Sequence, residues 1–117
     1  HGIREAITES NERDINQIFE NIVFLELLRD GYNVKIGKID SYEIDFVCTK
    51  PNRDLIYIQV AYLLASQETI EREFSPLEEI KDNYPKYVIS MDEFDMSRNG
   101  IKHINIVDFL TNGFNNK

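Results

Sequence analysis

Apolar and polar residues alternate in two neighbouring segments of the chain, residues 42–48 and 55–61. Both segments are rich in β-branched and aromatic residues, and the turn-forming stretch 51–54 lies between them. A period of two on either side of such a connection predicts a β-hairpin. Strict alternation assigns Glu43, Asp45 and Val47 to one face of the first strand, and Tyr57, Gln59 and Ala61 to one face of the second.

A helical period precedes the hairpin and predicts a helix over about residues 11–30. Ser10 or Asn11 is expected to cap its start, and Gly31 to end it. The apolar positions that define the stripe are Ile15, Ile18, Phe19, Ile22, Val23 and Leu25. On a helical wheel Glu26 follows Ile22 and Val23 by four and three residues, which places it on the apolar face, whereas Glu20 lies toward the edge of that face. Glu26 is therefore expected to be the more buried carboxylate and to have a partner within the domain.

The remaining pattern predicts three more strands and further helices. A strand is expected over residues 32–39, with an irregularity at Gly37, and two more over 87–91 and 102–106. One helix is expected after Ser66, a second starting at residues 75–78, and a final helical turn at 107–110. The fold class predicted is α/β, with a central mixed sheet of about four to five strands flanked by helices.

The length and composition of the chain indicate how many domains it forms and which compartment it occupies. With 117 residues, 42% of them hydrophobic and 29% charged, the chain is expected to form a single domain over residues 1–117. Residues 1–10 are interpreted as a tag remnant, a linker or a helix extension. No apolar run reaches the roughly 20 residues that span a bilayer, so no membrane partner is expected. The lone Cys48 lies in a strand pattern, which favours packing and a reducing cytoplasm.

Charge restricts the choice of partners. The formal net charge is −8, which works against independent nucleic-acid binding. The acidic run Asp92, Glu93 and Asp95 is interpreted as a solvated loop, and His103 as a structural residue. The chain contains no glycine-rich phosphate loop.

Asp45 and Gln59 stand out because they are polar residues in the middle of predicted strands. Burying a polar group without a partner costs on the order of 1–3 kcal/mol, and more for a charge. Their presence therefore predicts either a functional site or a hydrogen-bond network.

The order of elements, with Glu20 on the first helix, Asp45 on the second strand and Gln59 on the third, resembles the PD-(D/E)xK nuclease superfamily. The resemblance implies that Glu20, Asp45 and Gln59 occupy the catalytic, magnesium-binding positions, with Glu26 secondary. Hard carboxylate oxygens suit magnesium, which neutralises charge on a phosphodiester. The opening of the first helix also looks like that of archaeal Holliday-junction resolvases.

A closer resemblance covers nearly the whole chain. Four ordered blocks carry it: ENIVFLELL with GY (20–28 and 31–32), EIDFV (43–47), IQVAY (58–62) and DNYPKYV (82–88). They are similar to the domain of unknown function at the C-terminal end of prokaryotic AAA-type ATPases. The resemblance implies that an ATPase module of the same parent chain is a partner, although these 117 residues contain no P-loop.

The chain departs from the nuclease pattern at the lysine that should follow Gln59 by two residues. That position is Ala61. Loss of such a group typically lowers the rate by about 10²–10³. Lys35, Lys38 or Lys50 would have to take its role.

Three hypotheses follow. The first is a degenerate, non-catalytic accessory domain of the ATPase that contacts protein or nucleic acid and needs no cofactor. The second is a magnesium-dependent DNA nuclease with a relocated lysine. The third is a structural or dimerising module in which Asp45 and Gln59 satisfy each other or nearby backbone groups.

Overall fold

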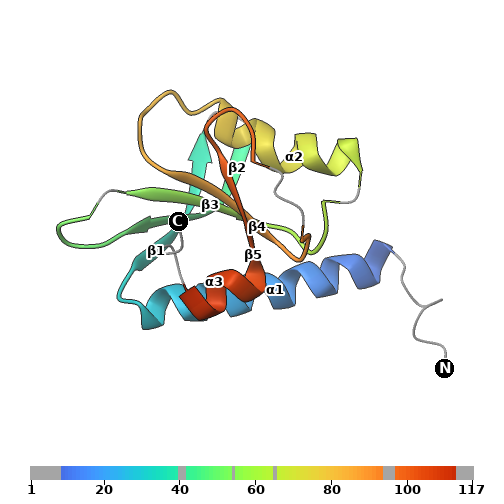
Figure 1. Cartoon of the computed structure of the whole chain (residues 1–117), viewed down its shortest axis with the longest axis horizontal. Coiled ribbons are helices and arrows are strands. Elements are labelled where there is room, and N and C mark those ends of the chain that lie inside the picture. Colours follow the sequence, from blue (N-terminus) through green and yellow to red (C-terminus); the bar gives the residue numbers. More distant parts are fainter. Residues whose placement is uncertain (1–8, 40–41, 54, 65, 94–96, 113–117) are drawn as a thin grey trace.

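The computed structural model describes residues 9–39, 42–53, 55–64, 66–93 and 97–112. This part of the chain forms three helices and five strands (Figure 1). In chain order they are α1 (Glu9–Arg29), β1 (Asn33–Ile39), β2 (Tyr42–Thr49), β3 (Ile56–Val60), α2 (Gln67–Glu78), β4 (Lys86–Ser90), β5 (Lys102–Asn105) and α3 (Ile106–Asn112).

The strands form one mixed sheet in the order β1-β2-β3-β4-β5. The first three strands pair antiparallel, and β3, β4 and β5 pair parallel. The connection from β3 to β4 runs through α2, which covers the face of the sheet opposite to α1 and α3 (Figure 1). The predicted α/β class and mixed five-strand sheet are confirmed.

Two apolar layers hold the helices on the sheet. On one face, Val23 and Leu27 of α1 and Phe109 of α3 pack with strand residues such as Ile58. On the other face, Phe74 and Leu77 of α2 pack with Tyr57 and Val88, among others. Full burial of one such large side chain contributes about 1.5–3 kcal/mol, so these layers fix where each helix lies.

The end of α1 is set by Gly31, as predicted. Gly31 has φ +95°, a left-handed conformation that favours glycine. Its N–H donates to the carbonyl of Leu28, and the N–H of Tyr32 donates to that of Leu27. These bonds satisfy carbonyls at the helix end and turn the chain into β1.

Strict alternation along β2 proved wrong, because this strand contains a β-bulge. Lys35 pairs with Val47 and Gly37 with Ile44, so two steps along β1 match three along β2. Ile44 consequently packs on the α2 side of the sheet, whereas Phe46 packs on the α1 side. Asp45 lies between them, within the bulge.

Alternation does hold along β3. Tyr57 and Ala61 belong to the layer under α2, whereas Ile56, Ile58 and Val60 belong to the layer under α1. A regular strand therefore lies beside a bulged one.

The prediction of two separate helices between Ser66 and Asn83 was wrong. Ser66 caps α2 as expected, accepting the N–H of Thr69, but the helix continues through Ser75 and Pro76 to Glu78. Proline lacks the N–H that would bond to the preceding turn, which weakens a helix. Here Pro76 lies in the last turn and is buried, so apolar packing offsets the missing bond.

Cys48 and His103 have the structural surroundings that were predicted, whereas Asp92, expected in a solvated loop, is partly buried and accepts hydrogen bonds. Cys48 is fully buried, and burial raises the pKa of its thiol to about 12. The hydroxyl of Ser90 lies 2.7 Å from Nε2 of His103 and donates to Asp92 at 2.7 Å, while Asp92 accepts the N–H of Leu64. These groups join β4, β5 and the segment after β3.

Several predictions fall outside the described residues, namely the turn at residues 40–41, the side chain of Asp95, the tail 113–117, and the interpretation of residues 1–8. Within the described part of the chain, no helix is long and apolar enough to cross a membrane.

The bulge generates a first prediction, at Gly37. A Cβ at this position would overlap the side chain of Val47 and crowd Ile44. Gly37→Ala is expected to lower the free energy of unfolding by about 1–3 kcal/mol, the usual cost of overpacking. Urea unfolding measures the change, and Lys38→Ala on the same exposed strand is the matched control. Equal midpoints for the two variants would contradict this account of the bulge.

Candidate functional site between β2 and β3

Side-chain hydrogen bonds replace the backbone ladder where β2 and β3 separate. The paired residues end at Phe46 and Ile58. Beyond them, the N–H of Asp45 donates to Oε1 of Gln59 at 2.8 Å, and the N–H of Val60 donates to Oδ2 of Asp45 at 2.9 Å. Each side chain thus satisfies a backbone group of the opposite strand, which explains why polar residues occur in these strand positions.

Gln59 extends this network to α2. Its Nε2 donates to the backbone carbonyl of Glu73 at 3.3 Å, and the residue is only 4% exposed. One buried amide therefore connects β2, β3 and α2. Leaving such a group unpaired would cost about 1–3 kcal/mol.

The helix α1 is attached beside the same fork. Oδ1 of Asn16 accepts the N–H of Tyr62 at 2.8 Å, and the rings of Phe19 and Tyr62 meet edge to face with centroids 5.3 Å apart. Glu20 follows Phe19 directly, so these contacts bring it to the end of β3.

Glu20 and Asp45 form the predicted part of a carboxylate cluster. The pKa of Glu20 is raised to about 7, by burial first and then by the charges of Asp45 and Glu43. The pKa of Asp45 is raised to about 6, chiefly by burial, although the N–H of Val60 opposes the increase. Both acids therefore favour protonation far more than ordinary carboxylic acids do.

Glu73 is a third member of the cluster, and the sequence pattern did not predict it. Its pKa is raised to about 7, by burial first and by the charge of Asp45 second. Arg72 counteracts this from an ion pair at 3.7 Å. A helical wheel offers a signal that could have found Glu73, since it lies three residues after Ile70 and next to Phe74, at the border of the apolar face of α2.

The carboxylates of Asp45 and Glu73 border an open depression of about 590 Å³. Its lining comprises Glu43, Asp45, Gln59, Glu68, Glu71, Arg72, Glu73, Ser75 and Pro76. Arg72 is the basic residue in this group, and four further acids besides Asp45 contribute to the lining. The depression is therefore acidic.

Glu26 lies apart from this cluster. It accepts a hydrogen bond from Nη2 of Arg29 at 2.9 Å, one turn further along α1. The partner predicted for Glu26 is present, but the Arg29 side chain is 74% exposed, so the pair is a surface one of modest strength.

The lysine position of the nuclease pattern is closed to solvent. Ala61 is 2% exposed and packs in the apolar layer with Phe74 and Leu77. The three lysines considered as substitutes do not line the depression. Lys50 lies over the ring of Tyr32 at 4.6 Å, and Lys35 and Lys38 are exposed on β1.

The donor groups do not fit a magnesium ion well. Among the described residues, no three His, Cys, Asp or Glu side chains are grouped so that they would hold a metal. One oxygen of Asp45 and the amide oxygen of Gln59 already accept backbone N–H groups. These two bonds join β2 to β3.

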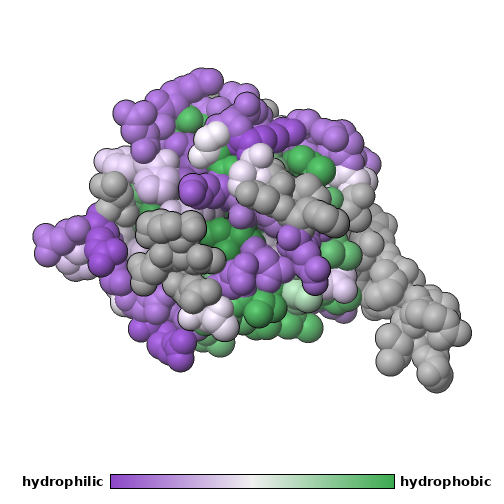
Figure 2. All heavy atoms as spheres, viewed as in Figure 1, coloured by the Kyte–Doolittle hydropathy of each residue, from purple (hydrophilic) through white to green (hydrophobic). Residues whose placement is uncertain are grey.

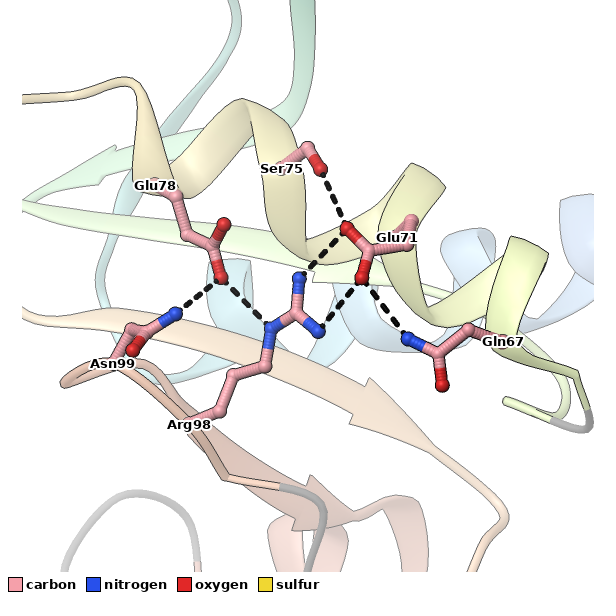
Figure 3. Close-up of polar contacts among 6 residues, drawn as sticks. All are labelled: Gln67, Glu71, Ser75, Glu78, Arg98 and Asn99. Atoms are coloured by element: carbon pink, nitrogen blue, oxygen red, sulfur yellow. Dashed lines mark hydrogen bonds and ion pairs between the residues drawn. The ribbon is translucent and has the colours of Figure 1, made fainter.

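A network around Arg98 fixes α2 above the sheet (Figure 3). The guanidinium donates to both carboxylate oxygens of Glu71, at 3.0 and 3.1 Å, and to Glu78 at 2.8 Å. Its carbon also lies 5.2 Å from the ring centroid of Phe74. The segment before β5 is thereby attached to the outer side of α2, the helix that carries Glu73.

The raised pKa values predict how stability depends on pH. Folding raises the pKa of Glu20, Asp45 and Glu73, so between about pH 4 and pH 7 the native state binds more protons than the unfolded chain. The free energy of unfolding should therefore fall as the pH rises through this range. Glu73→Gln should flatten the dependence and stabilise the domain at pH 8. Urea unfolding at pH 5 and pH 8 measures it, with the exposed Glu68→Gln as control. The same loss of stability in Glu73→Gln as in the unmodified chain would contradict the cluster.

Arg98 provides a separate prediction. Lysine keeps the charge but cannot bind Glu71 through two parallel N–H groups, so Arg98→Lys should lower the free energy of unfolding by about 1 kcal/mol. Arg53→Lys, at an exposed position, should leave it unchanged. Thermal melts of both variants give the comparison, and a neutral Arg98→Lys would show that the network adds little.

Comparison with known proteins finds a long relative. No family model matches the chain. An uncharacterized protein of Haemophilus influenzae (strain ATCC 51907 / DSM 11121 / KW20 / Rd) is 41% identical to it over 108 residues, which is 92% of this chain. The chain spans 26% of the length of that relative.

Proposed function

We propose that this chain is a non-catalytic, nuclease-like accessory domain of a larger AAA-type ATPase, and that it works through protein contacts. The burial of Ala61 carries the proposal. The residue in the position of the catalytic lysine is part of an apolar layer, and the neighbouring Asp45 and Gln59 are engaged in joining β2 to β3.

The arrangement of elements supports the nuclease-like assignment. A helix that carries Glu20 is followed by an antiparallel meander with Asp45 and Gln59 on its second and third strands, and then by a crossover helix and parallel strands. These are the elements and the order that the PD-(D/E)xK resemblance implies. Glu20 and Asp45 lie close enough for the charge of Asp45 to raise the pKa of Glu20.

The chemistry of the depression supports loss of catalysis. Phosphodiester hydrolysis of this type needs ionised carboxylates that hold magnesium and a cation that stabilises the developing charge. Here the position of that cation is taken by the buried Ala61, and Asp45 and Gln59 already accept backbone N–H groups. Each missing electrostatic or acid–base group costs about 10²–10³ in rate, so the combined loss would leave little activity.

Charge supports protein contacts over nucleic acid. The formal net charge is −8, and the depression is lined mainly by acids. Phosphate groups would be repelled there. The ATPase assignment is supported by the four sequence blocks at positions 20–32, 43–47, 58–62 and 82–88. The length of the Haemophilus relative leaves room for such a module in that protein.

The decisive experiment measures cleavage of supercoiled plasmid and branched DNA with magnesium or manganese. The unmodified domain and Asp45→Asn should both show background cleavage only. Asparagine retains an oxygen that can accept the N–H of Val60, so this variant is expected to fold. Gel-shift assays at low salt should show no binding to the same DNA. Robust cleavage that Asp45→Asn abolishes would overturn the proposal.

That outcome would favour the alternative, a magnesium-dependent nuclease with a relocated cation. One observation favours Arg72 over a lysine for this role, since Arg72 borders the depression and is ion-paired with Glu73. Cleavage lost in Arg72→Gln as well as in Asp45→Asn would identify it. Arg53→Gln is the matched control at an exposed site.

The ATPase assignment has its own test in the full-length parent protein. ATP hydrolysis is expected there, and Asp45→Asn should leave its rate unchanged because this proposal gives the carboxylate a structural role. A parent protein without ATPase activity would contradict the assignment.

A further inference from the structure

The outward face of α1 exposes a stripe of large apolar side chains. Ile18 and Leu25 are 55% and 63% exposed, and Ile22 and Leu28 are also exposed. Val23 and Leu27 of the same helix are fully buried on the opposite side. Figure 2 shows apolar residues gathered along the lower edge of the molecule, where α1 and α3 lie in Figure 1. Contiguous exposed apolar surface of this kind marks an interaction site.

The spacing of the stripe indicates the shape of the partner. Ile18, Ile22 and Leu25 follow one another at intervals of four and three residues, so they form one row along the helix. Such a row packs into the grooves of another helix at an interaxial distance of about 8–10 Å. The partner surface is therefore itself an apolar helix.

Charges at the two ends of the row indicate which helix this is. Asp14 precedes Ile18 by four residues, and Arg29 follows Leu25 by four residues. Both flanking residues are exposed. The row is thus bounded by opposite charges at equal distances from its centre, between Asn21 and Ile22.

We propose that the outward face of α1 binds the same face of a second copy of this chain, in an antiparallel arrangement about a two-fold axis. Ile18 of one copy then contacts Leu25 of the other, and Asp14 of one copy meets Arg29 of the other. A two-fold contact requires a self-complementary surface. The apolar row and its flanking charges, Asp14 and Arg29, meet this requirement in shape and in charge.

A parallel arrangement would oppose Asp14 to Asp14 and Arg29 to Arg29. The intramolecular bond of Arg29 to Glu26 uses one of its five N–H donors, so the guanidinium retains donors for the second copy. The antiparallel pair is therefore compatible with the contacts inside each copy.

Sedimentation velocity over a wide range of concentrations tests the contact. The unmodified chain should form a dimer. Leu25→Glu should be monomeric with an unchanged circular dichroism spectrum, because the side chain is exposed and the fold does not depend on it. Ile36→Glu, at an exposed apolar position on β1, should remain dimeric. A monomer at all concentrations, or a dimer that persists in Leu25→Glu, would overturn the proposal.

Charge reversal tests the arrangement. Arg29→Asp and Asp14→Arg should each weaken the dimer by roughly tenfold, because each creates two like-charge contacts per dimer. The double variant should restore the original affinity. Glu26→Gln, which removes only the negative charge of the intramolecular pair with Arg29, should have no effect. A double variant as weak as the single ones would refute the antiparallel two-fold.

Discussion

Two side-chain hydrogen bonds at the separation of β2 and β3 are the constraint on which the other parts of this domain depend. Asp45 and Gln59 each accept a backbone N–H of the facing strand, at the point where the regular ladder has ended. Without them, two N–H groups would be left without partners in a poorly solvated place. The strand β3 also joins the antiparallel and parallel halves of the sheet, so these two hydrogen bonds connect both halves. Gln59 extends the network to α2.

Under the proposed function, the same two residues account for the lack of catalysis. A carboxylate that holds a strand has less freedom to bind a metal, and an amide oxygen that accepts a backbone N–H has less still. Glu20 and Glu73 add negative charge to the same partly buried location. Burial and the neighbouring carboxylates therefore raise the pKa of both groups. Asp45 and Gln59 join the two strands, and Ala61 completes an apolar layer beside them.

Local periodicity was sufficient to predict most of the elements. The helix that ends at Gly31, the hairpin and the mixed sheet follow from spacing and turn residues that are near in sequence. The structure brings Asp45 within hydrogen-bond distance of Gln59, and close enough to Glu20 to raise its pKa. What failed depended on distant neighbours. At the bulge in β2, the side chain of Val47 fills the space above Gly37, and where α2 continues through Pro76, tertiary packing buries the ring.

For α1 as well, the sequence pattern alone could not predict which side chains face the sheet. This helix has large apolar residues on nearly every side, so its period could not reveal which side faces the sheet. The contact of Asn16 with Tyr62 and the burial of Val23 settle it. Glu20 thereby lies over the fork, whereas Glu26 pairs with Arg29 further along the helix. Glu73 was missed for a related reason, since its importance appears only once α2 covers the fork.

The topology of the sheet has a consequence for the order in which the domain assembles. The meander β1-β2-β3 has short connections, whereas β4 and β5 join it in parallel after the α2 crossover. Local pairings close with less loss of chain entropy than distant ones, so the meander has the kinetic advantage. Asp45 belongs to the meander, but Glu73 arrives with α2. The electrostatic repulsion between them therefore arises only when the crossover helix docks. Alkaline conditions would therefore weaken the docking of α2 without affecting the pairing of strands within the meander.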